Sequence, residues 1–263
     1  MIEEVGALLR ETAAGVVLPA FGHLNPGEVE EKAPGEVVTV ADRQAERKLA
    51  EGLRRILPGS EVVGEEGVAA DPSELDLLRD PGPVWLVDPV DGTANFAAGR
   101  RPFAMMVALL RGGATEASWI LDPVDDSLAV AVAGEGAYLD GVRVRARREE
   151  PAPGRLRGAM PIRFLPPDLR ASVEGRWEGL GELLPGQHCA GREYPDVVVD
   201  RQHFAFFWRT LPWDHAPGVL LVREAGGVAR RLNGDPYDPA DDQRGLLVAA
   251  NERIWETVRE SLG

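Results

Sequence analysis

Cysteine is nearly absent from this chain of 263 residues, since Cys189 is the single one. An intrachain disulfide is therefore excluded, as is typical of proteins from a reducing compartment, and we expect a cytoplasmic location. The N-terminus, MIEEVGALLRE, lacks the basic start and apolar run of a signal peptide. No segment approaches the ~20 apolar residues that cross a bilayer, so we expect no membrane partner.

Positive charge is also scarce. The sequence has 29 Lys and Arg against 43 Asp and Glu, and its net charge is −14. This balance argues against nucleic acid as a main partner, because polyanions bind to basic surfaces. An acidic protein that binds phosphate needs a local device, either a metal ion or the N-terminus of a helix.

What is present is an ordinary globular composition, with enough residues for a large core in one or two units. Hydrophobic periodicity predicts helices and strands in both halves. We expect two closely packed halves, an N-terminal α+β half (1–150) and a C-terminal α/β half (151–263). Predicted helices cover residues 2–20, 43–57, 214–225 and 251–262, the last with Asn251 as its cap. Residues 61–67 read as a strand that runs into a polar turn, and 84–87 as a buried strand that ends at Asp88. Further predicted strands are 104–110, 115–121 and 127–133.

Two stretches of the chain look alike. WLVDPVDGTANF covers residues 85–96 and WILDPVDDSLAV covers residues 119–130. In the first, the tight turn that Gly92 permits is followed by the good helix-start residues Thr93 and Asn95. Asp88 and Asp91 are then held on one turn at the end of a buried strand. We interpret them as metal ligands that lie beside a helix start able to bind an anion.

The second stretch has no glycine and no helix start. It continues as an alternating apolar run, so we interpret it as the turn of a β-hairpin with Asp125 and Asp126 solvated. The site is predicted at the first stretch alone.

DPVDGTANF resembles the signature of the inositol monophosphatase family of metal-dependent, lithium-sensitive phosphomonoesterases. Further motifs follow in the family's order over most of the chain. The resemblance implies the layered αβαβα sandwich of the sugar phosphatases, and a homodimer. The supporting motifs are TVAD (39–42), GEE (64–66), GEGA with DG (134–141), PWDHAPG (212–218) and EAGG (224–227).

The resemblance implies a magnesium site with two to three Mg²⁺ ions per subunit. Glu65, Asp88 and the backbone carbonyl of Val90 would bind a first ion, and Asp88, Asp91 and Asp214 a second. Glu65 would also help to hold a third, mostly hydrated ion. Carboxylates are the hard ligands that Mg²⁺ prefers, and such a cluster would repel itself without cations.

By the same resemblance, Asp42 and Thr93 would polarise the attacking water. Taken alone, Asp42, Thr93 and Asp214 could each be helix caps, and residues 65–66 could be a solvated turn. Lys32 could touch the phosphate or be a surface charge.

The family position of the substrate falls on Cys189, Ala190 and Gly191, with Asp91, Gly92 and Thr93 on the phosphate side. Inositol-cleaving members carry a glutamate where this chain has Phe207 or Trp208, which puts inositol in doubt. Arginines at 192, 201 and 209 could meet a second phosphate or lie on the surface.

We therefore expect a phosphatase for a small phosphorylated polyol or sugar, acting by metal-activated water attack. Alternative substrates are fructose 1,6-bisphosphate, histidinol phosphate and a 3′-phosphonucleotide. An alternative of another class is a regulatory or scaffold protein with the same fold.

Overall fold

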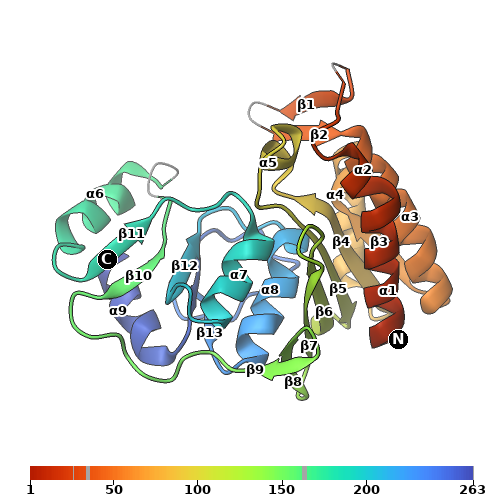
Figure 1. Ribbon diagram of the computed structural model, residues 1–263. Coiled ribbons are helices and arrows are strands. Elements are labelled where there is room, and N and C mark those ends of the chain that lie inside the picture. Colours follow the sequence, from red (N-terminus) through yellow and green to blue (C-terminus); the bar gives the residue numbers. More distant parts are fainter. Residues whose placement is uncertain (26, 34–35, 162–164, 263) are drawn as a thin grey trace.

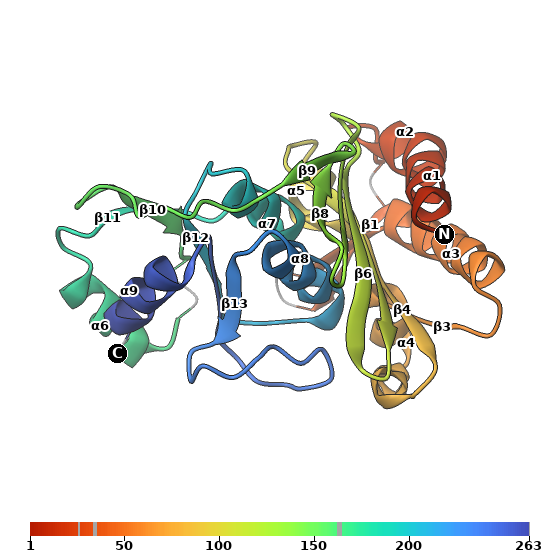
Figure 2. The same ribbon diagram turned by 90° about the horizontal axis from the view of Figure 1, so that it is seen from below.

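The structure, a computed structural model, describes residues 1–25, 27–33, 36–161 and 165–262. Five layers follow one another across the molecule (Figure 1). Helices α1 and α3 cover the outer face of a seven-stranded sheet, α7 and α8 lie between this sheet and a five-stranded one, and α6 and α9 cover the far side. The view in Figure 2 shows the same order from below. The predicted αβαβα sandwich is confirmed.

The large sheet is built mainly from consecutive antiparallel strands. Its order is β3-β4-β5-β6-β7-β8-β9, and only β3 and β4 are parallel. The strands are β3 (Glu61–Gly64), β4 (Pro83–Asp91), β5 (Ala104–Arg111), β6 (Ala114–Asp122), β7 (Ser127–Val132), β8 (Gly136–Leu139) and β9 (Val142–Val144).

Helices from the first 56 residues cover the outer face of this sheet. A π-helical turn, Ala13–Val17, joins α1 to α2, and a small hairpin precedes α3. Leu9, Leu49 and Leu53 are fully buried against Trp85 and Trp119 of the sheet. The elements are α1 (Ile2–Thr12), α2 (Leu18–Ala20), β1 (Val29–Ala33), β2 (Glu36–Thr39) and α3 (Val40–Ile56).

The smaller sheet has the order β11-β10-β12-β14-β13, with β10, β11 and β12 parallel and the other pairs antiparallel. Its strands are β10 (Leu156–Ala159), β11 (Gly181–Leu184), β12 (Phe204–Phe207), β13 (Val228–Arg231) and β14 (Leu246–Ala249). The first sheet is complete before the second begins, but α8 packs on strands of both. The division near residue 150 stays a prediction.

The remaining helices lie between the sheets, outside the second sheet, or at strand ends. Pro212 opens α8, and the side chain of Asn251 accepts from the backbone N–H of Ile254, so the predicted cap of α9 is confirmed. These helices are α4 (Glu65–Ala70), the 3₁₀ helix Pro72–Arg79, α5 (Thr93–Ala97), α6 (Pro167–Arg176), α7 (Ala190–Val198), α8 (Pro212–Glu224) and α9 (Glu252–Leu262).

Two local predictions were wrong. The polar turn expected after β3 is helix α4, because a carboxylate from α3, that of Glu46, accepts the N–H groups of its first turn. The strand expected to end at Asp88 continues to Asp91, with an irregular register against β5 between these two residues. This irregularity turns both aspartates toward the end of the sheet.

The glycine-rich hairpin before β8 is held by the C-terminal half. Glu224, at the end of α8, accepts hydrogen bonds of 2.9 Å from the backbone N–H groups of both Gly134 and Gly136. Two of the motifs that supported the family resemblance are therefore joined by a structural contact.

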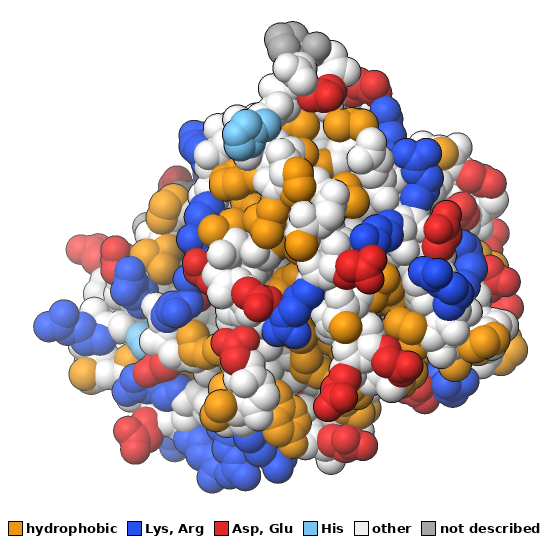
Figure 3. Space-filling model, turned by 45° about the vertical axis from the view of Figure 1, so that its right-hand side comes forward, with side chains coloured by type: hydrophobic (Ala, Val, Ile, Leu, Met, Phe, Trp, Pro, Cys, Tyr) orange, Lys and Arg blue, Asp and Glu red, His pale blue; other side chains and the backbone are white. Residues whose placement is uncertain are grey.

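Acidic and basic side chains are interspersed on the face shown in Figure 3, with hydrophobic side chains among them. The net charge therefore does not form one uniform acidic surface on this face. None of the described helices is long and apolar enough to cross a membrane.

Candidate active site

The first Asp-Pro-Val-Asp stretch forms the end of β4 and the turn into α5. Asp88 is 1% exposed and Asp91 8%. Gly92 has a φ of 87°, which a glycine adopts without strain. A Cβ there would also lie 3.1 Å from the carbonyl of Pro102 and 3.2 Å from that of His188. The glycine therefore permits both the turn and the close approach of the C-terminal half.

Four of the predicted carboxylates line one cavity of about 680 Å³. Glu65 begins α4, Asp88 and Asp91 end β4, and Asp214 lies in the first turn of α8. Asp88 and Asp214 are in side-chain hydrogen-bond contact. Acidic groups far apart in the sequence thus meet at the boundary between the two sheets.

Burial and mutual repulsion raise the pKa values of these groups. Burial, then the charges of Glu65 and Asp91, hold the pKa of Asp88 well above its ordinary value. Burial and the charge of Asp91 do the same to the pKa of Asp214. Burial raises the pKa of Glu65 to about 7, although Lys32 opposes the rise. A cation in the cavity would remove this repulsion.

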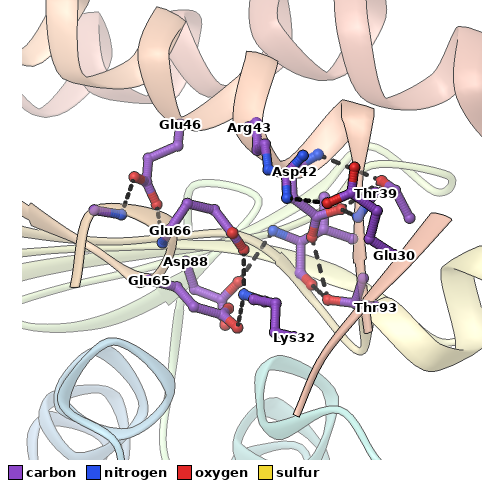
Figure 4. A network of polar contacts seen from close by, with 12 residues as sticks. Glu30, Lys32, Thr39, Asp42, Arg43, Glu46, Glu65, Glu66, Asp88 and Thr93 are labelled. Atoms are coloured by element: carbon purple, nitrogen blue, oxygen red, sulfur yellow. Dashed lines mark hydrogen bonds and ion pairs between the residues drawn. The ribbon is translucent and has the colours of Figure 1, made fainter. Parts of the chain in front are cut away.

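Glu65 and Asp91 also have partners within the protein. The Nζ of Lys32 lies 3.0 Å from Oε1 of Glu65 and 2.5 Å from Oε1 of Glu66, as Figure 4 shows. The backbone N–H of Gly191 donates to Asp91 Oδ2 at 2.6 Å. Across the described residues no three His, Cys, Asp or Glu side chains are placed to hold one metal ion. The carboxylates gather at the cavity without forming a finished ligand set.

The chemistry of the donors nevertheless fits magnesium. They are carboxylate oxygens, which hard divalent cations prefer. The nearby thiol of Cys189 is buried, and burial together with the charge of Asp91 keeps its pKa well above the ordinary value. A neutral thiol is a poor metal ligand, so the donor set favours Mg²⁺ over a thiolate-seeking metal.

Asp42 and Thr93 lie together beside this cavity. Thr93 Oγ1 is 3.2 Å from Asp42 Oδ1 and 2.9 Å from the carbonyl oxygen of Val90, and its one proton can be donated to either acceptor. Asp42 is fully buried, which raises its pKa to about 6. Its other oxygen, Oδ2, accepts from the backbone N–H and the hydroxyl of Thr39, the N-cap of α3. Asp42 is therefore both part of a capping box and a partner of Thr93.

Glu46 is a residue of this region that the sequence analysis missed. Its carboxylate reaches from α3 to α4 and accepts from the backbone N–H groups of Glu66 and Gly67, both at 2.8 Å (Figure 4). A Cβ on Gly64 would collide with this carboxylate at 2.3 Å. Glu46 therefore fixes the helix start that carries Glu65. Its position one helical turn after Asp42, on the same face, was the available signal.

The remaining predicted site residues divide into two groups. Cys189, Ala190, Gly92 and Thr93 line the cavity, and so does Lys32. Gly191 is absent from the lining. Its N–H donates to Asp91, and a Cβ added to it would lie 2.6 Å from the Cβ of Ala104. Val90 also lines the cavity, although it is fully buried from solvent.

The three arginines considered for a second phosphate differ in their surroundings. Arg192 and Arg201 both pair with Asp196, at 3.1 Å and 3.0 Å. Arg209 lines the main cavity. Two of the three are therefore engaged by a buried carboxylate.

The look-alike stretch is a hairpin turn, as predicted. It connects β6 to β7, and Asp122 Oδ1 accepts from the N–H groups of Val124 and Asp125. Asp125 pairs with Arg101 at 2.5 Å, and Asp126 pairs with Arg10 at 2.6 Å.

Replacement of Asp125 by Ala is expected to leave phosphatase activity within about twofold of wild type, because its exposed ion pair contributes little. Steady-state turnover of a phosphate ester checks this. A loss of a hundredfold or more would show that the site had been assigned to the wrong one of the two stretches.

Comparisons with known proteins agree with the sequence motifs. The sequence profile described as "Inositol monophosphatase family" matches residues 2–262. An inositol-1-monophosphatase of Rhizobium meliloti is 31% identical over 91% of this chain and 88% of its own length. A Nus factor SuhB of Pseudomonas aeruginosa is 30% identical over 94% of this chain and 90% of its own length.

Solved structures show the same fold. The extragenic suppressor protein suhB from Bartonella henselae superposes with a TM-score of 0.80 at 25% identity, covering 98% of both chains. The family is one of phosphatases that are generally metal-dependent. Since the profile spans nearly the whole sequence, this chain belongs to the inositol monophosphatase family.

Proposed function

We propose that the protein is a Mg²⁺-dependent phosphomonoesterase that hydrolyses a small phosphorylated metabolite. The observation that carries this proposal is the gathering of Glu65, Asp88, Asp91 and Asp214 around one cavity, with the Thr93–Asp42 pair beside it. Folding such carboxylates together costs free energy, and a divalent cation is the partner that offsets this cost.

Glu65, Asp88, Asp91 and Asp214, with the carbonyl oxygen of Val90, would hold two to three Mg²⁺ ions. When bound, the ions supply charge neutralisation for the phosphate oxygens and lower the pKa of a water molecule. The protein's own part is to orient that water and to accept its proton.

Thr93 and Asp42 are placed to accept the proton that the attacking water loses. The Thr93 hydroxyl is 3.2 Å from Asp42 Oδ1, so a proton taken from water at Thr93 can pass to the carboxylate. Asp42 is held by Thr39, and its pKa of about 6 leaves it ionised, and able to accept, near neutral pH.

Two features bear on the substrate. The pairing of Arg192 and Arg201 with Asp196 disfavours a second phosphate at those two residues, and Arg209, which lines the cavity, is the arginine at which a bisphosphate is tested. A similar chain named a Nus factor keeps open a regulatory role by protein binding. A binding surface alone gives no physical reason to bury mutually repelling carboxylates, so catalysis is favoured.

A phosphate-release screen tests the proposal. The purified protein is incubated with inositol 1-phosphate, ribose 5-phosphate, adenosine 5′-monophosphate, histidinol phosphate and fructose 1,6-bisphosphate, each with Mg²⁺ or with EDTA. We expect turnover of at least one ester with Mg²⁺ and none with EDTA. Absence of release from every ester would favour the regulatory role.

A further inference from the structure

The wall of the cavity contributed by β12 and α8 carries a stack of rings. Tyr194 and Phe207 are nearly parallel, with ring centroids 5.1 Å apart and an interplanar angle of 20°. The ring of His215 lies 4.7 Å from that of Phe207. Phe207 and His215 line the cavity, and Tyr194 is fully buried. Of the two aromatic residues that stand in place of the family's acid, Phe207 is the one that lines the cavity.

The polar atoms of this stack form hydrogen bonds within the protein. His215 Nε2 is 3.1 Å from the carbonyl oxygen of Arg209, which can only accept, so this nitrogen carries the proton. His215 Nδ1 then accepts from the Tyr194 hydroxyl at 2.8 Å. With Nε2 donating and Nδ1 accepting, the ring carries a single proton and is neutral. The stack therefore offers the cavity ring surface without adding a charge.

The packing behind the rings fixes their place. A Cβ on Gly218 of α8 would lie 2.1 Å from the Tyr194 ring, so only a glycine lets Tyr194 approach α8. Tyr194 in turn supports Phe207. Rigid aromatic surfaces of this kind bind flat rings at little entropic cost.

Glu193, an acid of the same cavity outside the cluster of four carboxylates, is held by hydrogen bonds within the protein. Glu193 lines the cavity but is 3% exposed, and its two oxygens accept from the N–H of Gln187 and from Gln202 Nε2, both at 2.6 Å. Hydroxyl groups of a polyol packed against Phe207 would lose hydrogen bonds to water without gaining this carboxylate.

We propose that the substrate is a phosphomonoester whose leaving group carries a flat, largely apolar ring that packs on Phe207, as in a nucleoside monophosphate. This inference rests on the proposed function and specifies its substrate class. A polyol phosphate should be the poorer substrate, because it presents hydroxyls to the same surface.

Adenosine 5′-monophosphate and ribose 5-phosphate make a matched test pair, because both release phosphate from the same primary hydroxyl and differ by the base. Stacking on an aromatic side chain predicts a kcat/KM about 10- to 100-fold higher for the nucleotide. In F207L the ratio of kcat/KM for the nucleotide to kcat/KM for ribose 5-phosphate should fall toward one. F207Y should retain the preference for the nucleotide.

The outcomes separate the two proposals. Equal kcat/KM values for the two esters in the wild type, or the wild-type ratio of the two retained in F207L, would overturn the aromatic-leaving-group inference while leaving the phosphatase intact. No hydrolysis of either ester or of the wider panel would overturn both. Because the ratio of two kcat/KM values does not depend on the concentration of active enzyme, partial misfolding of F207L does not affect this comparison.

Discussion

The Asp88→Asn protein should lose roughly a thousandfold or more in turnover, equivalent to about 4 kcal/mol of activation free energy, and yet melt at a higher temperature when metal is removed. Asp88 is the carboxylate shared by both proposed Mg²⁺ positions, so an amide there weakens the whole ion cluster. Interactions realised only with the bound ions and the transferring phosphate are then lost together.

The opposite effect on metal-free stability follows from the burial of Asp88. The folded-state pKa of Asp88 is raised by burial and by the charges of Glu65, Asp91 and Asp214. The folded protein therefore binds a proton here more tightly than the unfolded chain does. Above the unfolded pKa, ionised Asp88 costs stability, and this cost grows as pH rises. Asn carries no charge and removes the cost at neutral pH.

Calorimetry with EDTA and with Mg²⁺ measures both effects. The wild type should gain melting temperature on adding Mg²⁺, because an ion that binds only the folded state stabilises it. Asp88→Asn should have a higher melting temperature in EDTA than the wild type and should gain less on adding Mg²⁺. Asp125→Asn, a change of the same chemistry at the hairpin turn, is the matched control and should behave as the wild type. A lower melting temperature for Asp88→Asn in EDTA would contradict the electrostatic argument.

Much of the site was accessible from the sequence because its signals are local. The strand before Asp88, the turn at Gly92 and the helix start after it follow from a few adjacent residues. The TVAD segment likewise predicts a helix start, but the cap of α3 is Thr39, and Asp42, considered as the cap from the sequence, lies in the first turn of the helix. Local steric and capping rules operate over three or four residues, so such patterns can be recognised in a single sequence.

Contacts between distant segments could not be predicted in this way. The turn expected at residues 65–66 becomes helix α4 only because Glu46, about 20 residues earlier, accepts its first N–H groups. Asp91 was predicted as a metal ligand, but its bond to Gly191 N, 100 residues away, also joins β4 to the start of α7. The sequence offers the position of Glu46 one turn after Asp42 but not its partner, and it offers nothing for the bond to Gly191, since each contact depends on how the layers pack.

The same limit applies to the aromatic wall. The sequence showed that an acid was missing near Phe207, and left open which aromatic residue replaced it. The stack with Tyr194 and His215 arises from β12, α7 and α8 meeting in the middle of the molecule. The proposed substrate class therefore depends on the packing of the two halves, which the sequence alone does not reveal.

The second large effect concerns the proton path. Thr93→Val keeps the shape of the side chain and removes its hydroxyl, so the attacking water loses its link to Asp42. We expect turnover to fall by about 10²–10⁴-fold, the usual contribution of a positioned general base. Mg²⁺ affinity, measured by titration calorimetry, should stay near the wild-type value, because the Thr93 side chain is not among the proposed ligands.

Asp42→Asn tests the other end of the pair, but it also disturbs the capping box, because Asp42 Oδ2 accepts from the backbone N–H of Thr39 at 2.9 Å. Thr39→Ala is therefore the matched control. It removes the cap hydroxyl at a cost of about 1 kcal/mol in stability, and it leaves the Thr93–Asp42 contact in place. Because the Thr39 hydroxyl also lowers the pKa of Asp42, this control should turn over within a few-fold of wild type above neutral pH and lose activity at a higher pH than the wild type does.

The double variant Thr93→Val with Asp42→Asn decides whether the two residues act as one unit. Groups in a single proton path are strongly non-additive, so the double variant should be about as slow as the slower single one. Independent roles would instead multiply the two losses. Multiplied losses would separate Asp42 from the proton path and leave it as a residue of the α3 capping box, which its bonds to Thr39 already make it.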